Sequence, residues 1–123
     1  MRTILVLALA CLITSTAVAA APSTSTGRVS VAQLFDLSQR SKTDGAAHGT
    51  LVAYLFAVGE TVGILADEAK QRGFPLECQR TFTLSEDAAM HALRMAAPDQ
   101  SAWAETAATP IIVADVLARA GCD

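Results

Sequence analysis

The clearest pattern in the chain is an apolar seam between about Ala46 and Arg72. Its members recur at spacings of three and four, which places them on one face of a helix. They are Leu51, Leu55, Val58, Val62, Leu65 and Ala69. Polar side chains occupy much of the opposite side, and Glu60 interrupts the apolar interior, which argues against a membrane span. The pattern predicts a central core helix about 40 Å long that ends at Gly73.

A shorter amphipathic helix precedes this element. Ser30 and Gln33 stand three apart, the spacing of a capping box. Val31, Leu34 and Leu37 then share one face, and Asp44-Gly45 marks a turn before the long helix.

Two further helices are predicted after the long one. Thr83 and Glu86 have capping-box spacing, and Pro98 would stop the helix that follows at about Ala97. Its proposed apolar stripe contains Leu84, Ala88, His91 and Met95.

The last helix would begin at Thr109, as the cap, with Pro110 in the first turn, and would end at Gly121. A segment around Trp103 would add a helical turn or two between these helices. Since no stretch alternates with period two, we predict an all-α fold, a small bundle of about four to five helices with one disulfide.

The first 20 residues have the layout of a secretory signal peptide. Arg2 is followed by an apolar run from Ile4 to Ile13 and then by small residues, and cleavage after Ala19 or Ala20 fits this layout. Cys11 would be removed with the signal, the alternative being a lipid-anchored cysteine. We therefore expect a periplasmic protein with a signal peptide at 1–20, a flexible linker at 21–29 and a helical domain at 30–123.

Two cysteines, Cys78 and Cys122, remain in the mature chain. An even count in an exported protein favours a disulfide. The bond would join the start of the third helix to the end of the fourth and close a helical hairpin, if these two helices are antiparallel and residues 79–85 are extended. An intermolecular bond or two free thiols are the alternatives.

Composition excludes several functions. Without Arg2 the chain has 8 basic and 12 acidic residues, so it lacks the basic face of a nucleic-acid-binding protein. Its two histidines, His48 and His91, are isolated, no nucleophile motif or phosphate loop is present, and two cysteines alone do not make a metal site. We predict a non-enzyme without cofactor or metal, with His91 partly buried as a structural residue.

Binding is the remaining class, and four residues are candidates for partner contact: His48, Tyr54, Glu60 and Trp103. Tyr and Trp are common at interaction hot spots and also in cores. Gly59 and Gly63 form a small-xxx-small pair that is costly inside a helix. Close approach of another helix would compensate for it, and a notch for a partner or a second subunit is the alternative.

Several motifs between residues 48 and 122 resemble, in order and spacing, the Rap/Tai family of immunity proteins. They are "YLFAVGE" in the long helix, "PLEC" before "TLSEDAAMHALRMAAPD", and the terminal "TPIIVADVLARAGC". Family members often carry a second cysteine pair, and here Ser38 and Leu51 stand at about those places. Both partners of that bridge are therefore missing together.

The resemblance implies a small exported helical protein that binds a secreted cell-wall amidase of the type VI secretion system and occludes it. The expected partner is thus a protein, with no nucleic acid and no stable membrane anchor, and a homodimer is possible. The alternative is a small periplasmic helical chaperone or structural protein.

Overall fold

The computed structural model describes residues 21–122, and in them the chain forms four α-helices, one short 3-10 helix and no named β-strand. The elements are α1 (Val31–Ser41), α2 (Gly45–Gln71), α3 (Glu86–Ala96), η1 (Gln100–Ala102) and α4 (Ala108–Ala120). The predicted all-α class is confirmed. The predicted signal peptide at 1–20, with Cys11, lies outside the described residues, as does Asp123.

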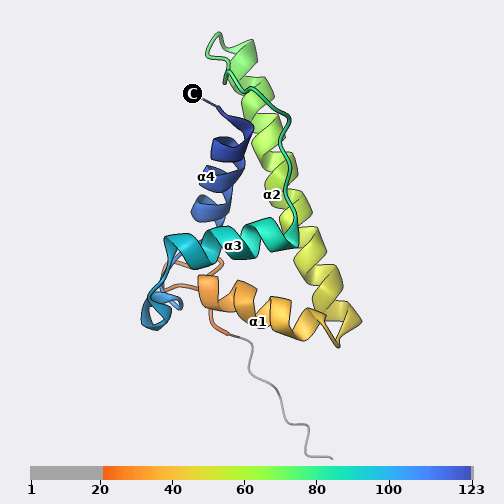
Figure 1. Cartoon of the computed structure of the whole chain (residues 1–123), viewed down its shortest axis with the longest axis vertical. Helices are drawn as coiled ribbons and strands as arrows, with labels where there is room; N and C mark the ends of the chain where they lie inside the picture. Colours follow the sequence, from red (N-terminus) through yellow and green to blue (C-terminus); the bar gives the residue numbers. More distant parts are fainter. Residues whose placement is uncertain (1–20, 123) are drawn as a thin grey trace, which may run out of the picture.

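The long helix α2 organises the arrangement. Figure 1 shows α1 and α3 lying one above the other against the lower half of α2, while α4 rises beside its upper half. Between α2 and α3 the chain turns back at Gly73 and runs down along α2 without regular structure. We call residues 74–85 the return segment.

The core lies where the four helices meet. Its fully buried side chains include Leu34 of α1, Leu51 of α2, Leu93 of α3 and Ile112 of α4. Most of the stabilisation of such a fold comes from this burial.

The predicted seam of α2 is correct over its first three turns, where Leu51, Leu55, Val58 and Val62 are all buried. It fails at Leu65, which is 60% exposed. Leu65 lines an open hollow between α2 and α4, together with Thr109 and Val113. A periodic pattern identifies a helix face, but the packing of the neighbouring helix decides how much of that face is covered.

The start of α1 is as predicted. The Ser30 hydroxyl accepts from the Gln33 amide (3.0 Å), and the Ser30 amide donates to the Gln33 side-chain oxygen (3.2 Å). The same hydroxyl donates to the Pro22 carbonyl (2.8 Å), although Ser30 is completely buried.

Ser30→Ala should lower the free energy of unfolding by about 1–2 kcal/mol, since it removes a helix cap and leaves buried backbone groups without a partner. Urea unfolding followed by circular dichroism measures this loss. The control is Ser23→Ala, at an exposed position before α1, which should change little. Equal stability of the two variants would contradict the assigned cap.

The predicted caps of α3 and α4 are wrong. Ser85 caps α3, accepting from the Ala88 amide (3.2 Å), because α3 begins at Glu86, whereas the Thr83 hydroxyl accepts from Arg119 Nη1 instead. In α4 the cap position is Ala107 and has no side-chain bond. A backbone contact compensates, as the Ala108 amide donates to the Val29 carbonyl (2.9 Å).

Residues 21–29, expected to be a loose linker, are instead tied to the helical body. Thr24 is buried, and the Ser25 amide and hydroxyl donate to the Glu105 carboxylate at 3.0 and 2.7 Å. The same two bonds lower the pKa of Glu105. Their partner lies 80 residues away, a pairing that sequence periodicity cannot reveal.

Candidate functional site: an open apolar groove on α2

A groove with apolar walls runs along α2, between the helix and the return segment. Its lower hollow has a volume of about 590 Å³. Residues of both elements line this hollow. They include Val52, Phe56, Gly59 and Glu60 from α2 and Phe82 and Leu84 from the return segment. An upper hollow of about 500 Å³ shares Gly59 and Phe82 with it and continues to Gly63, Pro75 and Leu76. We call the two hollows together the α2 groove.

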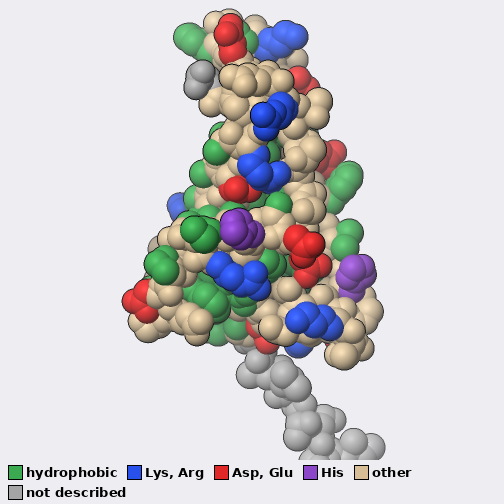
Figure 2. Space-filling model, in the orientation of Figure 1, with side chains coloured by type: hydrophobic (Ala, Val, Ile, Leu, Met, Phe, Trp, Pro, Cys, Tyr) green, Lys and Arg blue, Asp and Glu red, His purple; other side chains and the backbone are tan. Residues whose placement is uncertain are grey.

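The apolar walls are uncovered to an unusual extent. Phe56 is 72% exposed and Val52 is 50% exposed, whereas large apolar side chains are usually buried. Figure 2 shows hydrophobic side chains protruding along the right-hand edge of the molecule, where α2 runs. Contiguous apolar surface of this kind is typical of an interaction site.

Length and composition alone would let α2 cross a membrane, and it is the one helix in residues 21–122 of which this is true. This is weak evidence, because core helices of soluble proteins satisfy the same criteria. A core helix is mostly buried, whereas only 22% of the most apolar window of α2 is buried. The expectation that α2 is simply a core helix therefore holds for one face only.

The glycine pair lies in the floor of this groove. Apart from the adjoining backbone of α2 and the chain neighbours, a Cβ atom built on Gly59 or on Gly63 would meet no described atom within 4 Å. The expectation that another helix of this chain packs closely against the pair is therefore wrong, and the open notch is the arrangement found. Both residues are half-exposed members of α2.

The two hollows of the groove differ in the charged side chains that line them. Glu60 and Glu86 line the lower hollow, and the Glu86 carboxylate accepts from the Ser38 hydroxyl (2.8 Å). Lys70 and Arg80 line the upper hollow together with Asp67. The three ion pairs found in residues 21–122 join Asp36 to Arg40, Glu68 to Arg72 and Asp115 to Arg119, so they leave all five groove charges unpaired.

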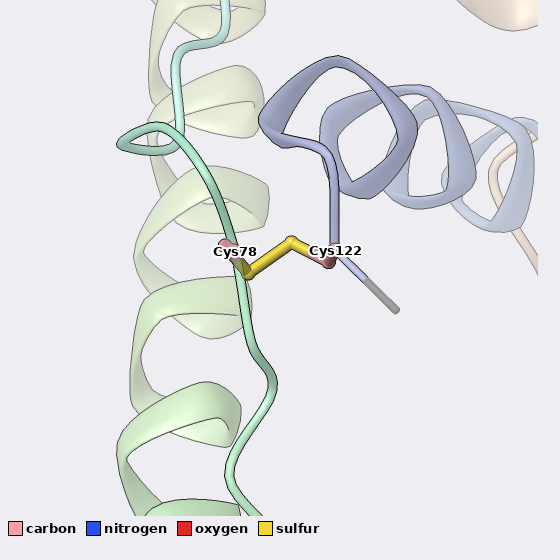
Figure 3. The surroundings of a disulfide bond; sticks show 2 residues. All are labelled: Cys78 and Cys122. Atoms are coloured by element: carbon pink, nitrogen blue, oxygen red, sulfur yellow. A yellow bond between two sulfur atoms is a disulfide. The ribbon is translucent and has the colours of Figure 1, made fainter.

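The disulfide holds one wall of the groove. Cys78 of the return segment is bonded to Cys122, just after α4, as predicted (Figure 3). The Arg80 amide beside it donates to the Ala120 carbonyl (3.0 Å), and Arg119 Nη1 donates to the Thr83 hydroxyl (3.2 Å). These contacts hold the return segment to the end of α4.

The predicted helical hairpin is wrong in its geometry. Figure 1 shows α4 rising at a steep angle from α3 rather than lying antiparallel beside it. The bond reaches Cys122 because the return segment carries Cys78 far above the start of α3. Residues 79–85 form no helix, but they are not extended throughout, since Gln79 and Arg80 are bends while Ser85 has an extended backbone.

Tyr54, one of the four candidate contact residues, links α2 to α4. Its hydroxyl shares a hydrogen bond with the hydroxyl of Thr109, which lies in the first turn of α4 (2.8 Å). The ring is half-buried against the core. Burial raises the pKa of Tyr54 above its ordinary value of 10.0, and the bond from Thr109 opposes this increase.

An absorbance titration of the chain, whose one tyrosine is Tyr54, should have a midpoint above pH 10.0. The folded state holds the phenol proton more tightly than the unfolded state does. The stability contributed by this difference is complete below pH 10.0 and is lost as the pH rises above it.

Thr109→Val should raise the midpoint further, since it removes the bond that lowers the pKa of Tyr54. Thr61→Val is the control, because the Thr61 hydroxyl donates within α2, to the Ala57 carbonyl, and its loss should leave the midpoint unchanged. A wild-type midpoint at or below the ordinary value would contradict the assigned burial.

Trp103 is engaged inside the fold. Its ring is stacked on Phe35 of α1 with centroids 4.3 Å apart, and its Nε1 donates to the Ala97 carbonyl (2.7 Å). The guanidinium of Arg94 lies over the other ring, 5.2 Å from the Phe35 centroid. This cluster joins α1, α3 and η1.

The two histidines are both exposed. His48 lies in the first turn of α2, as expected. The prediction of a partly buried His91 is wrong, because the stripe chosen for α3 is on the wrong face. Ala89, Met90, Ala92 and Leu93 are buried instead, while Met95 is 70% exposed.

The structure therefore does not bring the four candidate contact residues together. Of them, only Glu60 lines the lower hollow. Sequence reasoning missed Val52, Phe56 and Phe82. The first two have a signal, because Val52, Phe56, Gly59 and Gly63 form a second stripe beside the core seam. Phe82 has none, since its position depends on the path of the return segment.

Between residues 21 and 122 no group of three His, Cys, Asp or Glu side chains is arranged to hold a metal ion. Comparison of the chain with protein-family models, with curated proteins and with solved structures finds no match. The α2 groove is thus the feature on which a function has to be argued.

Proposed function

We propose that this chain is an exported immunity protein that binds a secreted cell-wall amidase and blocks its cleft by protein-protein contact. The observation that carries the proposal is the α2 groove, with Phe56 72% exposed on its rim. Uncovered aromatic side chains beside a hollow are typical anchors of a protein interface. The order of motifs that resembles the Rap/Tai family supports the class of partner.

The disulfide suits such a role. A return segment held at Cys78 and Arg80 keeps one wall of the groove in place before any partner arrives. Preorganisation lowers the conformational entropy lost on binding and so increases affinity. An oxidised, rigid groove is the form in which an exported inhibitor would work.

The test is inhibition of an amidase. The oxidised chain, mixed with a purified secreted peptidoglycan amidase encoded beside its gene, should abolish release of cleaved peptide from cell walls near equimolar ratio. Phe56→Asp should restore amidase activity. Ile64→Asp is the matched control, because Ile64 is 60% exposed on α2 but does not line the groove, and it should inhibit normally.

Full amidase activity in the presence of excess wild-type chain, with no complex in gel filtration, would refute the proposal. A second candidate is a periplasmic chaperone, favoured by the same exposed apolar walls. A chaperone would suppress aggregation of unrelated unfolded proteins, whereas an immunity protein should not.

A further inference from the structure

The α2 groove has the form of a docking site for a helix. Val52, Phe56, Gly59 and Gly63 follow one another at spacings of four, three and four, so they share one face of α2 over about 17 Å. Helices in contact lie about 8–10 Å apart, depending on the side chains between them. A floor without side chains lets a second helix come close, with apolar anchors on either side of the notch.

The charges of the groove specify what such a helix carries. Glu60 and Glu86 make the lower hollow acidic, and no Lys or Arg of residues 21–122 lines it. Lys70 and Arg80 outnumber Asp67 in the upper hollow. Glu60 and Lys70 are ten residues apart on α2, or about 15 Å along the axis. A complementary helix has a basic residue at one end and an acidic residue about ten positions away.

A second copy of this chain fits the groove less well. Oligomers of identical chains are usually related by a two-fold axis. If two α2 helices packed antiparallel across their Gly59–Gly63 notches, the two copies of Glu60 would approach each other near that axis. Like charges at the centre of an interface are unfavourable.

A membrane surface also fits less well. Membrane surfaces that contain anionic lipids carry a negative potential and attract basic protein segments. The lower hollow presents two carboxylates beside its apolar walls. Charge therefore favours a protein helix over lipid at this site.

We propose that the α2 groove binds an amphipathic helix of the partner protein, seated on Gly59 and Gly63, with a Lys or Arg facing Glu60 and Glu86. This inference rests on the proposed function, whose partner it specifies. The helix inserts apolar side chains between Phe56 and Phe82, and an acidic residue near its other end faces Lys70 and Arg80.

A displayed library of helical peptides tests the proposal without any amidase. Peptides of about 18 residues, long enough to cover both hollows at 1.5 Å per residue, are selected on the oxidised wild-type chain and counter-selected on Phe56→Asp. The enriched peptides should carry a Lys or Arg about ten positions from an Asp or Glu. Absence of enrichment, or enrichment without a basic residue, would overturn the proposal.

Charge reversal supplies the second measurement. Glu60→Lys should weaken binding of an enriched peptide roughly tenfold, and replacing the basic residue of the peptide by Glu should restore it. Glu77→Lys is the control, because Glu77 is exposed on the return segment outside both hollows. If Glu77→Lys lowered the affinity for the peptide as much as Glu60→Lys does, the loss would come from the change in net charge alone. That result would overturn the assigned contact with Glu60.

Two other results would assign the groove to a different occupant and so overturn the proposal. One is a dimer in sedimentation analysis that Phe56→Asp abolishes, and the other is binding to vesicles of phosphatidylglycerol that the same change abolishes. Because the peptide measurement contains no amidase, specific peptides without amidase inhibition would refute only the immunity function. Amidase inhibition that survives Phe56→Asp would refute only the groove.

Discussion

Replacing Cys78 and Cys122 together by serine is expected to lower the free energy of unfolding by about 4 kcal/mol. The bond joins residues 44 positions apart, and in the chain-entropy model a loop of this length gives a stabilisation of that size. Small domains are stable by only about 5–15 kcal/mol. The double variant should therefore have lost a large fraction of its stability.

Removing the disulfide should also have a local effect, on the return segment. Without the disulfide, the contacts that hold the return segment to the end of α4 are those from Arg80 to Ala120 and from Arg119 to Thr83. The wall formed by Phe82 should become mobile before the core unfolds. Hydrogen exchange should therefore increase first at residues 76–84 and only later in α1 and α2.

Urea unfolding of the wild-type chain, with and without reductant, and of the double variant measures the effect. Reductant should destabilise the wild-type chain and leave the double variant unchanged, which provides the internal control. If the reduced wild-type chain is as stable as the oxidised one, the bond contributes nothing and the return segment is held by its other contacts.

The success of the sequence predictions depends on the range of the interactions that decide them. The α1 cap depends on Ser30 and Gln33, three residues apart, and the sequence predicts it correctly. The cap of α3 is also local, but Thr83 and Ser85 are both acceptable caps. The path of the return segment selects Ser85, and that path depends on Cys122, 44 positions from Cys78.

The range of the interactions also decides which groove residues the sequence could predict. Gly59, Gly63 and Glu60 are recognisable in the sequence because they break the pattern of an apolar helix. The groove itself requires a second wall, and Phe82 reaches it only through the return segment. His91 shows the reverse case, since its predicted stripe is periodic but His91 and Met95 in it are exposed. Periodicity gives the faces of a short helix, while tertiary contacts choose between them.

A comparison of two leucines on α2 tests where the core ends. Leu51→Ala should lower the free energy of unfolding by about 2–5 kcal/mol, because Leu51 is completely buried and its loss leaves a cavity. Leu65 belongs to the same predicted seam but is 60% exposed. Leu65→Ala should cost less than about 0.5 kcal/mol, the usual range for surface changes.

The two substitutions remove the same atoms from the same helix, so differences in helix propensity cancel. The difference between their unfolding free energies therefore reports burial alone. Thermal unfolding should separate the variants clearly, since 1 kcal/mol shifts the Tm of a domain of this size by about 4–8 °C. Similar losses at both positions would mean that Leu65 is covered, by a second copy or by another segment, and that the buried seam of α2 continues beyond Val62.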